Sequence, residues 1–200
     1  MLALLDRKAE IRRVTKETTI SLSLNLDGSG EYDVSTGIGM LDHMIEQLAR
    51  HSQFDITVDA TGDIERDPHH LVEDLGLVLG QALNDALGER RGIVRFGHAI
   101  VPMDESLILV AVDLGGRPYA GIELGFAREK IGELPAENVE HFFESFAQAG
   151  RLNLHVREFS GENDHHRIEA CFKALARALS VAVGIDERIA GEVPSTKDVL

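Results

Sequence analysis

Two short stretches of the chain repeat one arrangement of histidine and glutamate. DPHHLVED at residues 67–74 holds His69, His70 and Glu73, and NDHHRIEA at residues 163–170 holds His165, His166 and Glu169. Successive residues of a helix turn by about 100°, so the two histidines of a pair diverge while the glutamate shares a face with both. One such turn can offer a nitrogen and an oxygen to one metal ion and its second histidine to another. Imidazole with carboxylate favours Mn, Fe, Zn or Ni over Ca or Mg.

Each pair is preceded by a further histidine on an apolar-periodic segment. His43 stands 26 residues before His69, and His141 stands 24 residues before His165. A single pair of this kind is often only a surface ion pair or a response to the helix dipole. That explanation does not account for a repeat, so we interpret the set as a metal site. The remaining histidines lack such pairing, and we expect His98 and His155 to be structural.

The divergence of the two histidines predicts that each pair is divided between two ions. One ion would take His69, Glu73, His141 and His166, and the other would take His165, Glu169, His43 and His70. Each ion then has three imidazoles and one carboxylate, with positions open for water and substrate. In this scheme, the second histidine of a pair is donated across a pseudo-twofold axis.

The elements that position these residues follow from the apolar periodicity. Apolar residues alternate along 20–26 as in a strand, and they recur at helical spacing along 40–48. The first histidine pair opens a helix that ends near Gly88, and the second opens one that ends near Gly184. The same order of segments occurs twice, which indicates an internal repeat. Glu17 aligns with Glu105 in the two copies.

The repeat predicts an α+β fold with two similar halves, each a mixed β-sheet covered on one face by two helices. We place the first half at residues 1–92, the second at 93–190 and a mobile tail at 191–200. The second half carries extra residues at about 128–135, before its histidine-bearing helix.

Composition sets limits on function. The net charge of -14 argues against a nucleic-acid surface, and no apolar run is long enough to span a membrane. The chain begins with five uncharged residues before Asp6, too few for a signal-peptide core. We therefore expect a cytoplasmic protein. Cys171 is the single cysteine and is expected to be a small core residue.

Several motifs together resemble imidazoleglycerol-phosphate dehydratase. They are GIGMLDHM, DPHHLVED, GRPY, EHFFESFA, NDHHRIEACFKA and PSTK, and the likeness extends from about residue 9 to residue 200. Met40, Ser52 and Asp198 stand where the family often has Phe, Gly and Gly. The resemblance implies that water is lost from imidazole glycerol phosphate to give imidazole acetol phosphate in histidine biosynthesis. It also implies two Mn²⁺ per site and a large octahedral homo-oligomer with active sites between subunits.

The resemblance also implies roles for individual residues. Glu17 is the candidate base, with Glu105 and Asp104 as runners-up, and Glu73 and Glu169 belong to the catalytic set. The substrate would contact Glu17, His43, His69 and Glu73. Its phosphate group would meet Arg95, Arg117, Lys173, Ser195 and Lys197, with His51 nearby. Ser195 and Lys197 lie on the tail, which could close over the substrate as a lid.

Two other functions are compatible with a metal site. A dinuclear metallohydrolase would need carboxylates that bridge its metals, and this chain is poor in suitably spaced aspartates. A non-catalytic metal-binding protein gives no reason for Glu17 or for the set of Arg117, Lys173 and Lys197.

Overall fold

The structure is a computed structural model that describes residues 7–189, 191–197 and 199–200. The apolar start of the chain and Asp198, both noted in the sequence, lie outside the described residues. The first half contains four strands and two helices: β1 (Lys8–Val14), β2 (Thr18–Asn25), β3 (Tyr32–Ser35), α1 (Gly39–Ser52), β4 (Asp55–Gly62) and α2 (His69–Leu87). No helix among the described residues is long and apolar enough to cross a membrane.

The second half repeats this order with one addition. Its elements are β5 (Phe96–Met103), β6 (Ser106–Asp113), β7 (Tyr119–Glu123), α3 (Ala136–Gly150), β10 (Asn153–Ser160) and α4 (Asp164–Ala182). The extra residues predicted before α3 contain a small hairpin of β8 (Lys130–Ile131) and β9 (Leu134–Pro135). A 3₁₀ turn, η1 (Glu187–Ile189), follows α4 and precedes the tail.

The two sheets share one topology. Their strand orders are β1-β2-β4-β3 and β5-β6-β10-β7, and in each sheet the last pair is parallel while the others are antiparallel. In β2, Ile20, Leu22 and Leu24 are buried and alternate with more exposed positions, as expected for a strand with one covered face. The predicted fold, two similar α+β halves with mixed sheets, is confirmed. The boundaries at residues 92 and 190 stay predictions.

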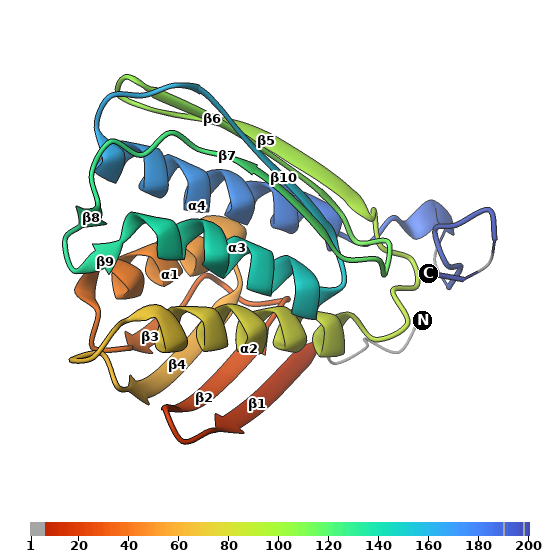
Figure 1. The fold of residues 1–200 in the computed structure, drawn as a ribbon. Helices are drawn as coiled ribbons and strands as arrows, with labels where there is room; N and C mark the ends of the chain where they lie inside the picture. The colour runs from red at the N-terminus through yellow and green to blue at the C-terminus, as the bar shows by residue number, and fades with distance from the viewer. Residues whose placement is uncertain (1–6, 190, 198) are drawn as a thin grey trace.

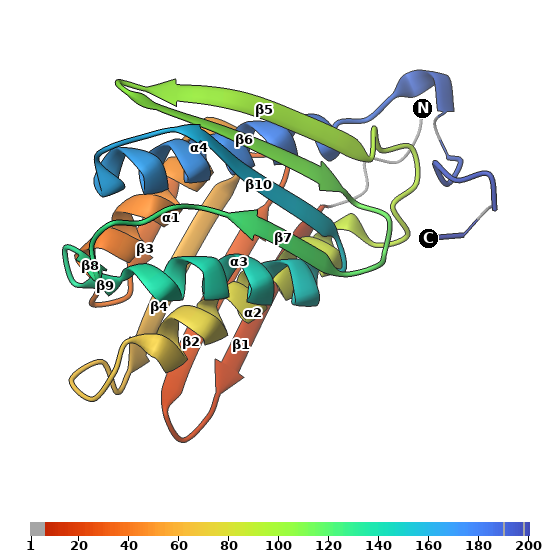
Figure 2. The same cartoon turned by 45° about the horizontal axis from the view of Figure 1, so that its top comes forward.

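All four helices lie between the two sheets (Figure 1). α1 and α2 cover the inner face of the first sheet, and α3 and α4 cover the inner face of the second. The turned view in Figure 2 keeps the same layers, with α2 beside α3 and α1 beside α4. Phe142 and Phe143 of α3 pack on Phe172 of α4, and Cys171 is buried as predicted. The helices therefore form the centre of the molecule and bring the two halves together.

The helices also share a direction. Each begins at the left end of the molecule in Figure 1, whereas α4 leads at the opposite end into the tail. The histidine-bearing turns lie at or near these helix starts, because His69 is the first residue of α2 and His165 the second of α4. One end of the molecule thus carries the predicted metal ligands, and the opposite end carries the tail.

Candidate functional site

The packing of α2 against α3 brings together one group of three candidate ligands. His69, Glu73 and His141 each offer an atom, and these atoms lie within 4.8 Å of one another. Glu73 Oε2 is 3.7 Å from His69 Nε2 and 3.6 Å from His141 Nε2. The two imidazoles stack with ring centroids 4.6 Å apart. We call this group the first triad.

The packing of α1 against α4 creates the matching group in the other pair of helices. His43, His165 and Glu169 form this second triad, with their offered atoms also within 4.8 Å of one another. Glu169 Oε2 is 3.3 Å from His43 Nε2 and 3.1 Å from His165 Nε2. Glu169 is buried, and its other oxygen is 2.6 Å from Lys173 Nζ. Burial alone would raise the pKa of Glu169, but the hydrogen bonds from Lys173 and His43 lower it.

Both triads fit a divalent transition metal. Each presents two imidazole nitrogens and one carboxylate oxygen converging on one point, the mixed donor set that suits Mn, Fe, Zn or Ni. Each leaves coordination positions open for a further ligand and for substrate. In both triads, the carboxylate oxygen lies between two Nε2 atoms, so an ion bound there would replace two close nitrogen–oxygen contacts with metal bonds.

The second histidine of each pair does not join a triad within one chain. His70 Nδ1 lies 3.2 Å from Asp63 Oδ1, and His166 Nδ1 lies 2.8 Å from Glu105 Oε2. The rings of neighbouring histidines are nearly perpendicular, at 83° in the first pair and 82° in the second. The divergence expected from helix geometry is therefore present, but one chain brings together three of the four ligands predicted for each ion.

Asp104 and Glu105, in the hairpin between β5 and β6, differ in their contacts. Glu105 accepts backbone N–H groups of Glu162 and Asn163 as well as contacting His166. The hydrogen bonds from the Asn163 backbone and from His166 hold the pKa of Glu105 well below its usual range. Asp104, the other runner-up, is near His166 in a third group of candidate ligands, 3.7 Å from its Nε2.

Glu17 lies near His70 without bonding to it. The hydrogen bond that His70 donates to Asp63 is the main cause of the raised pKa of His70, and the charge of Glu17 adds to it. Glu17 is exposed, and its carboxylate has no hydrogen bond or ion pair within the described part of the chain. Its side chain is therefore available to a substrate.

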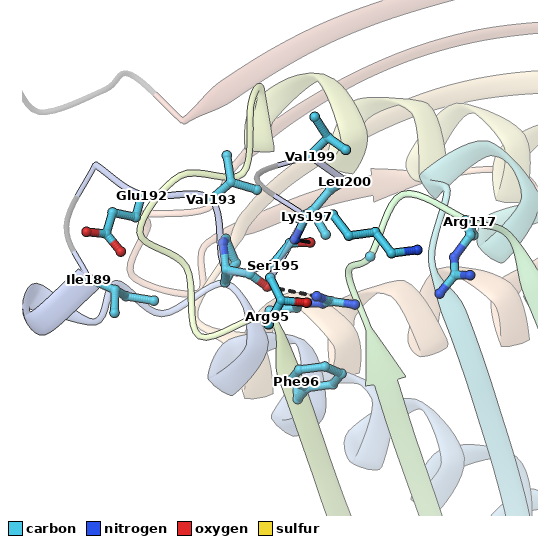
Figure 3. A pocket seen from close by; sticks show the side chains of 13 residues that line it. Arg95, Phe96, Arg117, Ile189, Glu192, Val193, Ser195, Lys197, Val199 and Leu200 are labelled. Carbon is cyan, nitrogen blue, oxygen red and sulfur yellow. Dashed lines mark hydrogen bonds between the residues drawn. The ribbon is translucent and has the colours of Figure 1, made fainter.

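A cavity at the tail end collects most of the predicted phosphate-binding residues. It has a volume of about 700 Å³, and its lining includes Arg95, Arg117, Ser195 and Lys197. Figure 3 shows the cationic ends of Arg95, Arg117 and Lys197 pointing toward the same space. The cavity can therefore hold an anionic group.

Arg95 is fixed by its neighbours in this cavity. Its guanidinium donates two hydrogen bonds to Asp113, of 2.7 and 3.0 Å, and a third of 2.7 Å to the Pro194 carbonyl of the tail. The residue has a φ of 74°, which is uncommon for a residue with a side chain. Asp113 offsets the charge of Arg95, which leaves Arg117 and Lys197 as the cations of a lining that also holds the acid Glu192.

Two residues predicted at the phosphate end lie elsewhere. Lys173 of α4 is paired with Glu169 of the second triad. His51 lies in the last turn of α1. Burial lowers the pKa of His51, and the nearby charges of Lys173 and Arg177 lower it further. The backbone N–H of Arg95 donates to Ala182 at the far end of α4. Ala182 stands thirteen positions after Glu169, which is about 20 Å along a helix.

The sequence did not point to Asp63 or Asp113. Asp63 precedes its histidine by seven residues and Asp113 follows Arg95 by eighteen, but neither pair lies within one helix or strand, so spacing alone does not predict the contact. The signals available were weak: an acid directly after a strand in the first case, and an acid at the end of a strand before a glycine turn in the second.

Comparison with known proteins agrees with the motifs. A sequence model of imidazoleglycerol-phosphate dehydratase matches residues 36–179. Imidazoleglycerol-phosphate dehydratase of Roseiflexus sp. (strain RS-1) is 56% identical over 194 residues, covering 97% of this chain and 98% of the relative. The enzyme of that name from Dehalococcoides mccartyi (strain CBDB1) is 58% identical and covers 97% of each chain.

Solved structures show the same fold. The crystal structure of imidazoleglycerol-phosphate dehydratase from Staphylococcus aureus subsp. aureus N315 superposes with a TM-score of 0.81 at 35% identity, covering 90% of this chain and 99% of the other. The crystal structure of imidazoleglycerol-phosphate dehydratase (IGPD) from Pyrococcus furiosus gives a TM-score of 0.82 at 38% identity, covering 95% of this chain and 100% of the other. The chain belongs to the imidazoleglycerol-phosphate dehydratase family.

Proposed function

We propose that this chain removes water from imidazole glycerol phosphate at a centre that holds two Mn²⁺ ions. Its family makes it a dehydratase of histidine biosynthesis that depends on metal. The proposal concerns the identity and number of the ions and the residues that act. A cytoplasmic location, where amino-acid biosynthesis takes place, is part of it.

The two triads are the proposed metal ligands, and the observation that carries the proposal is their doubled geometry. His69, Glu73 and His141 would hold one ion, and His43, His165 and Glu169 the other. His166 would complete the first set and His70 the second, as the sequence predicts. When bound, the ions would supply Lewis-acid activation of the imidazole ring and its leaving hydroxyl.

Glu17 is the proposed general base. It would take the side-chain proton that must leave a carbon with little acidity of its own, and a positioned carboxylate can do this. Glu105 is a poorer candidate, because its carboxylate already accepts four hydrogen bonds, from Glu162, Asn163, His166 and the Ser106 hydroxyl. The carboxylate of Glu17 has no such partners within the described residues.

The phosphate group would bind in the tail-end cavity. Arg117 and Lys197 would supply charge, and the Ser195 hydroxyl would donate a further hydrogen bond. Arg95 is anchored to Asp113 and would shape the pocket and the tail through Pro194. The predicted closing of the tail as a lid would bring Ser195 and Lys197 to the substrate.

The separation of these groups favours active sites between subunits. Arg95 lies about 20 Å along α4 from Glu169, whereas the substrate places its phosphate only a few bonds from its ring. A neighbouring copy that inserts its cavity end against the triads of the first would unite both. The proposed octahedral homo-oligomer provides such contacts, with Lys173 and His51 on the triad side.

Assay of imidazole glycerol phosphate with and without Mn²⁺ tests the proposal. We expect imidazole acetol phosphate to form only in the metal-loaded protein, with two ions bound per chain by elemental analysis. Turnover that survives complete removal of metal would contradict it. A preparation fully active with one ion per chain would also exclude the two-metal centre.

A further inference from the structure

The second histidine of each pair meets a carboxylate through the same ring nitrogen. His70 turns Nδ1 to Asp63, and His166 turns Nδ1 to Glu105. An imidazole held in this way carries its proton on Nδ1 and presents Nε2 on the opposite side as a ligand atom. Carboxylates commonly orient metal-binding histidines by this contact.

The two halves use acids from different places for this contact. In the second half the partner is Glu105, from the hairpin between β5 and β6. The repeat sets Glu17 at the equivalent position between β1 and β2. His70 nevertheless pairs with Asp63, which directly follows β4.

The connection before the histidine helix explains the difference. In the second half, three residues (161–163) join β10 to α4, and two of them donate backbone N–H groups to Glu105. In the first half, six residues (63–68) join β4 to α2. This longer connection folds back as a turn, in which the backbone N–H of Arg66 donates to the carbonyl of Asp63 at 2.8 Å.

Asp63 is also tied to the residue that it replaces. Its backbone N–H donates to the Glu17 carbonyl at 3.2 Å, which fixes the two backbones side by side. The side chain of Asp63 faces His70, while the side chain of Glu17 forms no hydrogen bond within the described residues. In the first half, therefore, Asp63 contacts the histidine while the carboxylate of the neighbouring Glu17 has no hydrogen bond within the described residues.

The second carboxylate oxygen of Asp63 lacks a hydrogen-bond partner within the described residues. Asp63 Oδ2 is buried and accepts no hydrogen bond in the described part of the chain. Arg66 Nη1 lies 3.6 Å from this oxygen, which is too long for a hydrogen bond. A buried oxygen without a partner is unfavourable for folding, and such groups call for another explanation.

We propose that Asp63 is a positioning residue that orients His70 for metal binding and, by doing so, leaves the Glu17 carboxylate unbonded for the reaction. The inference rests on the proposed function, in which His70 is a ligand and Glu17 the base. It assigns the two tasks to separate acids in the first half, whereas in the second half Glu105 has only the orienting task.

The tautomer of His70 tests the first part in the unaltered chain. Full-length protein labelled with ¹⁵N-histidine and freed of metal is examined by NMR above pH 8, with His70 assigned by the signal missing from H70Q. We expect neutral His70 to carry its proton on Nδ1. A proton on Nε2 would overturn the assignment without need of any variant at Asp63.

Variants at Asp63 test the consequence for metal binding. We expect D63A to bind Mn²⁺ about 10- to 100-fold more weakly than the wild type. D63N keeps an oxygen that can accept from Nδ1, so its affinity should stay close to that of the wild type. The matched control is D59N, which removes an exposed acid from β4, the strand that Asp63 follows. Equal affinity of D63A and D59N would refute the proposal.

Turnover at saturating Mn²⁺ tests the second part. In D63A, Glu17 becomes the acid beside His70 and is drawn into that contact, so kcat should fall even with metal bound, and D63N should restore it. An unchanged kcat in metal-loaded D63A would refute the claim that Asp63 supports the reaction by leaving the Glu17 carboxylate unbonded. Absence of dehydratase activity in the wild type would refute the proposed function instead, while tautomer and affinity would still decide on Asp63.

Discussion

At the scale of single residues, the two triads are alike in donors but not in surroundings. Glu169 is buried and paired with Lys173, four residues later, whereas Glu73 is partly exposed. Four residues after Glu73 stands Leu77, which cannot form such a pair. The duplicated site is therefore asymmetric, with a fixed cation beside the second triad. A substrate with a negative group would be oriented by this difference.

Replacing Glu17 by Gln tests the proposed base. E17Q should lose about 10²- to 10⁴-fold in kcat, because an amide cannot accept the substrate proton. Its Mn²⁺ content should be that of the wild type, since Glu17 belongs to neither triad. The measurement is steady-state turnover together with elemental analysis. E10Q, at an exposed acid of β1, is the control, and near-normal turnover of E17Q would exclude the role.

The gathering of the triad residues could be predicted from helical spacing and from the repeat, because i, i+4 neighbours share a face. Their role as ligands stays a prediction. The partners of His70 and Arg95 could not be predicted, because both contacts depend on how a connection folds. The separation of Lys173 from Arg117 could not be predicted either. It follows from the contact of Arg95 with Ala182, which places the cavity at the far end of α4.

At the scale of elements, the first triad depends on how closely α2 approaches α3. A Cβ atom at Gly80 would lie 2.5 Å from the Phe146 carbonyl oxygen and 2.8 Å from the Gly150 nitrogen. A Cβ atom at Gly76 would lie 2.7 Å from the Phe142 carbonyl oxygen. These glycines allow the two backbones to come together, which sets the distance from Glu73 to His141.

Replacing Gly80 by Ala should separate the two helices. We expect G80A to cost about 1–3 kcal/mol in the free energy of unfolding, because the new methyl group meets backbone atoms. Alanine would otherwise favour the helix by about 1 kcal/mol. Urea denaturation measures the cost, and Mn²⁺ affinity should fall as well. G39A is the control, since a Cβ there meets nothing within 4 Å. Equal stability of G80A and G39A would contradict the close packing.

Asp55 at the start of β4 gives a prediction for pH. Burial alone would raise the pKa of Asp55, but hydrogen bonds from the backbone of Ser29 and Glu31 and from Asn25 outweigh it and lower the pKa. A lowered pKa in the folded state contributes stability above the unfolded pKa of about 3.9. That contribution is lost as pH falls through the folded value.

D55N should therefore be less stable than the wild type at pH 7, by about 1–2 kcal/mol. The difference should shrink as the pH falls below about 4. Unfolding by urea at pH 7 and at pH 3 measures both values, with D59N on the same strand as the control. A difference that is the same at the two pH values would show that the charge of Asp55 is not responsible.

At the scale of the whole molecule, the candidate site residues gather at two ends. The triads lie at the start of the helices, and the cationic cavity lies by the tail (Figure 1). The fold class could be predicted from the repeated order of segments and is confirmed. The distance between the ends could not, because the sequence does not state that all four helices point the same way.

Removal of metal should reduce the size of the assembly. One chain gathers three of the four ligands predicted for each ion, so the fourth would come from a neighbour and the metal would join two chains. Light scattering after gel filtration should detect a smaller species in chelator and recovery of the full size when Mn²⁺ is returned. A chelated protein that keeps its original size would contradict shared ligands.

Mixing two inactive variants tests most directly whether one site is built from two chains. K173A alters the triad end and R117A alters the cavity end, and each assembly alone should be nearly inactive. When the two are co-assembled in equal amounts, roughly a quarter of the sites should receive unaltered residues from both neighbours and regain activity. Activity of the mixture no higher than that of either variant alone would contradict a site shared between chains.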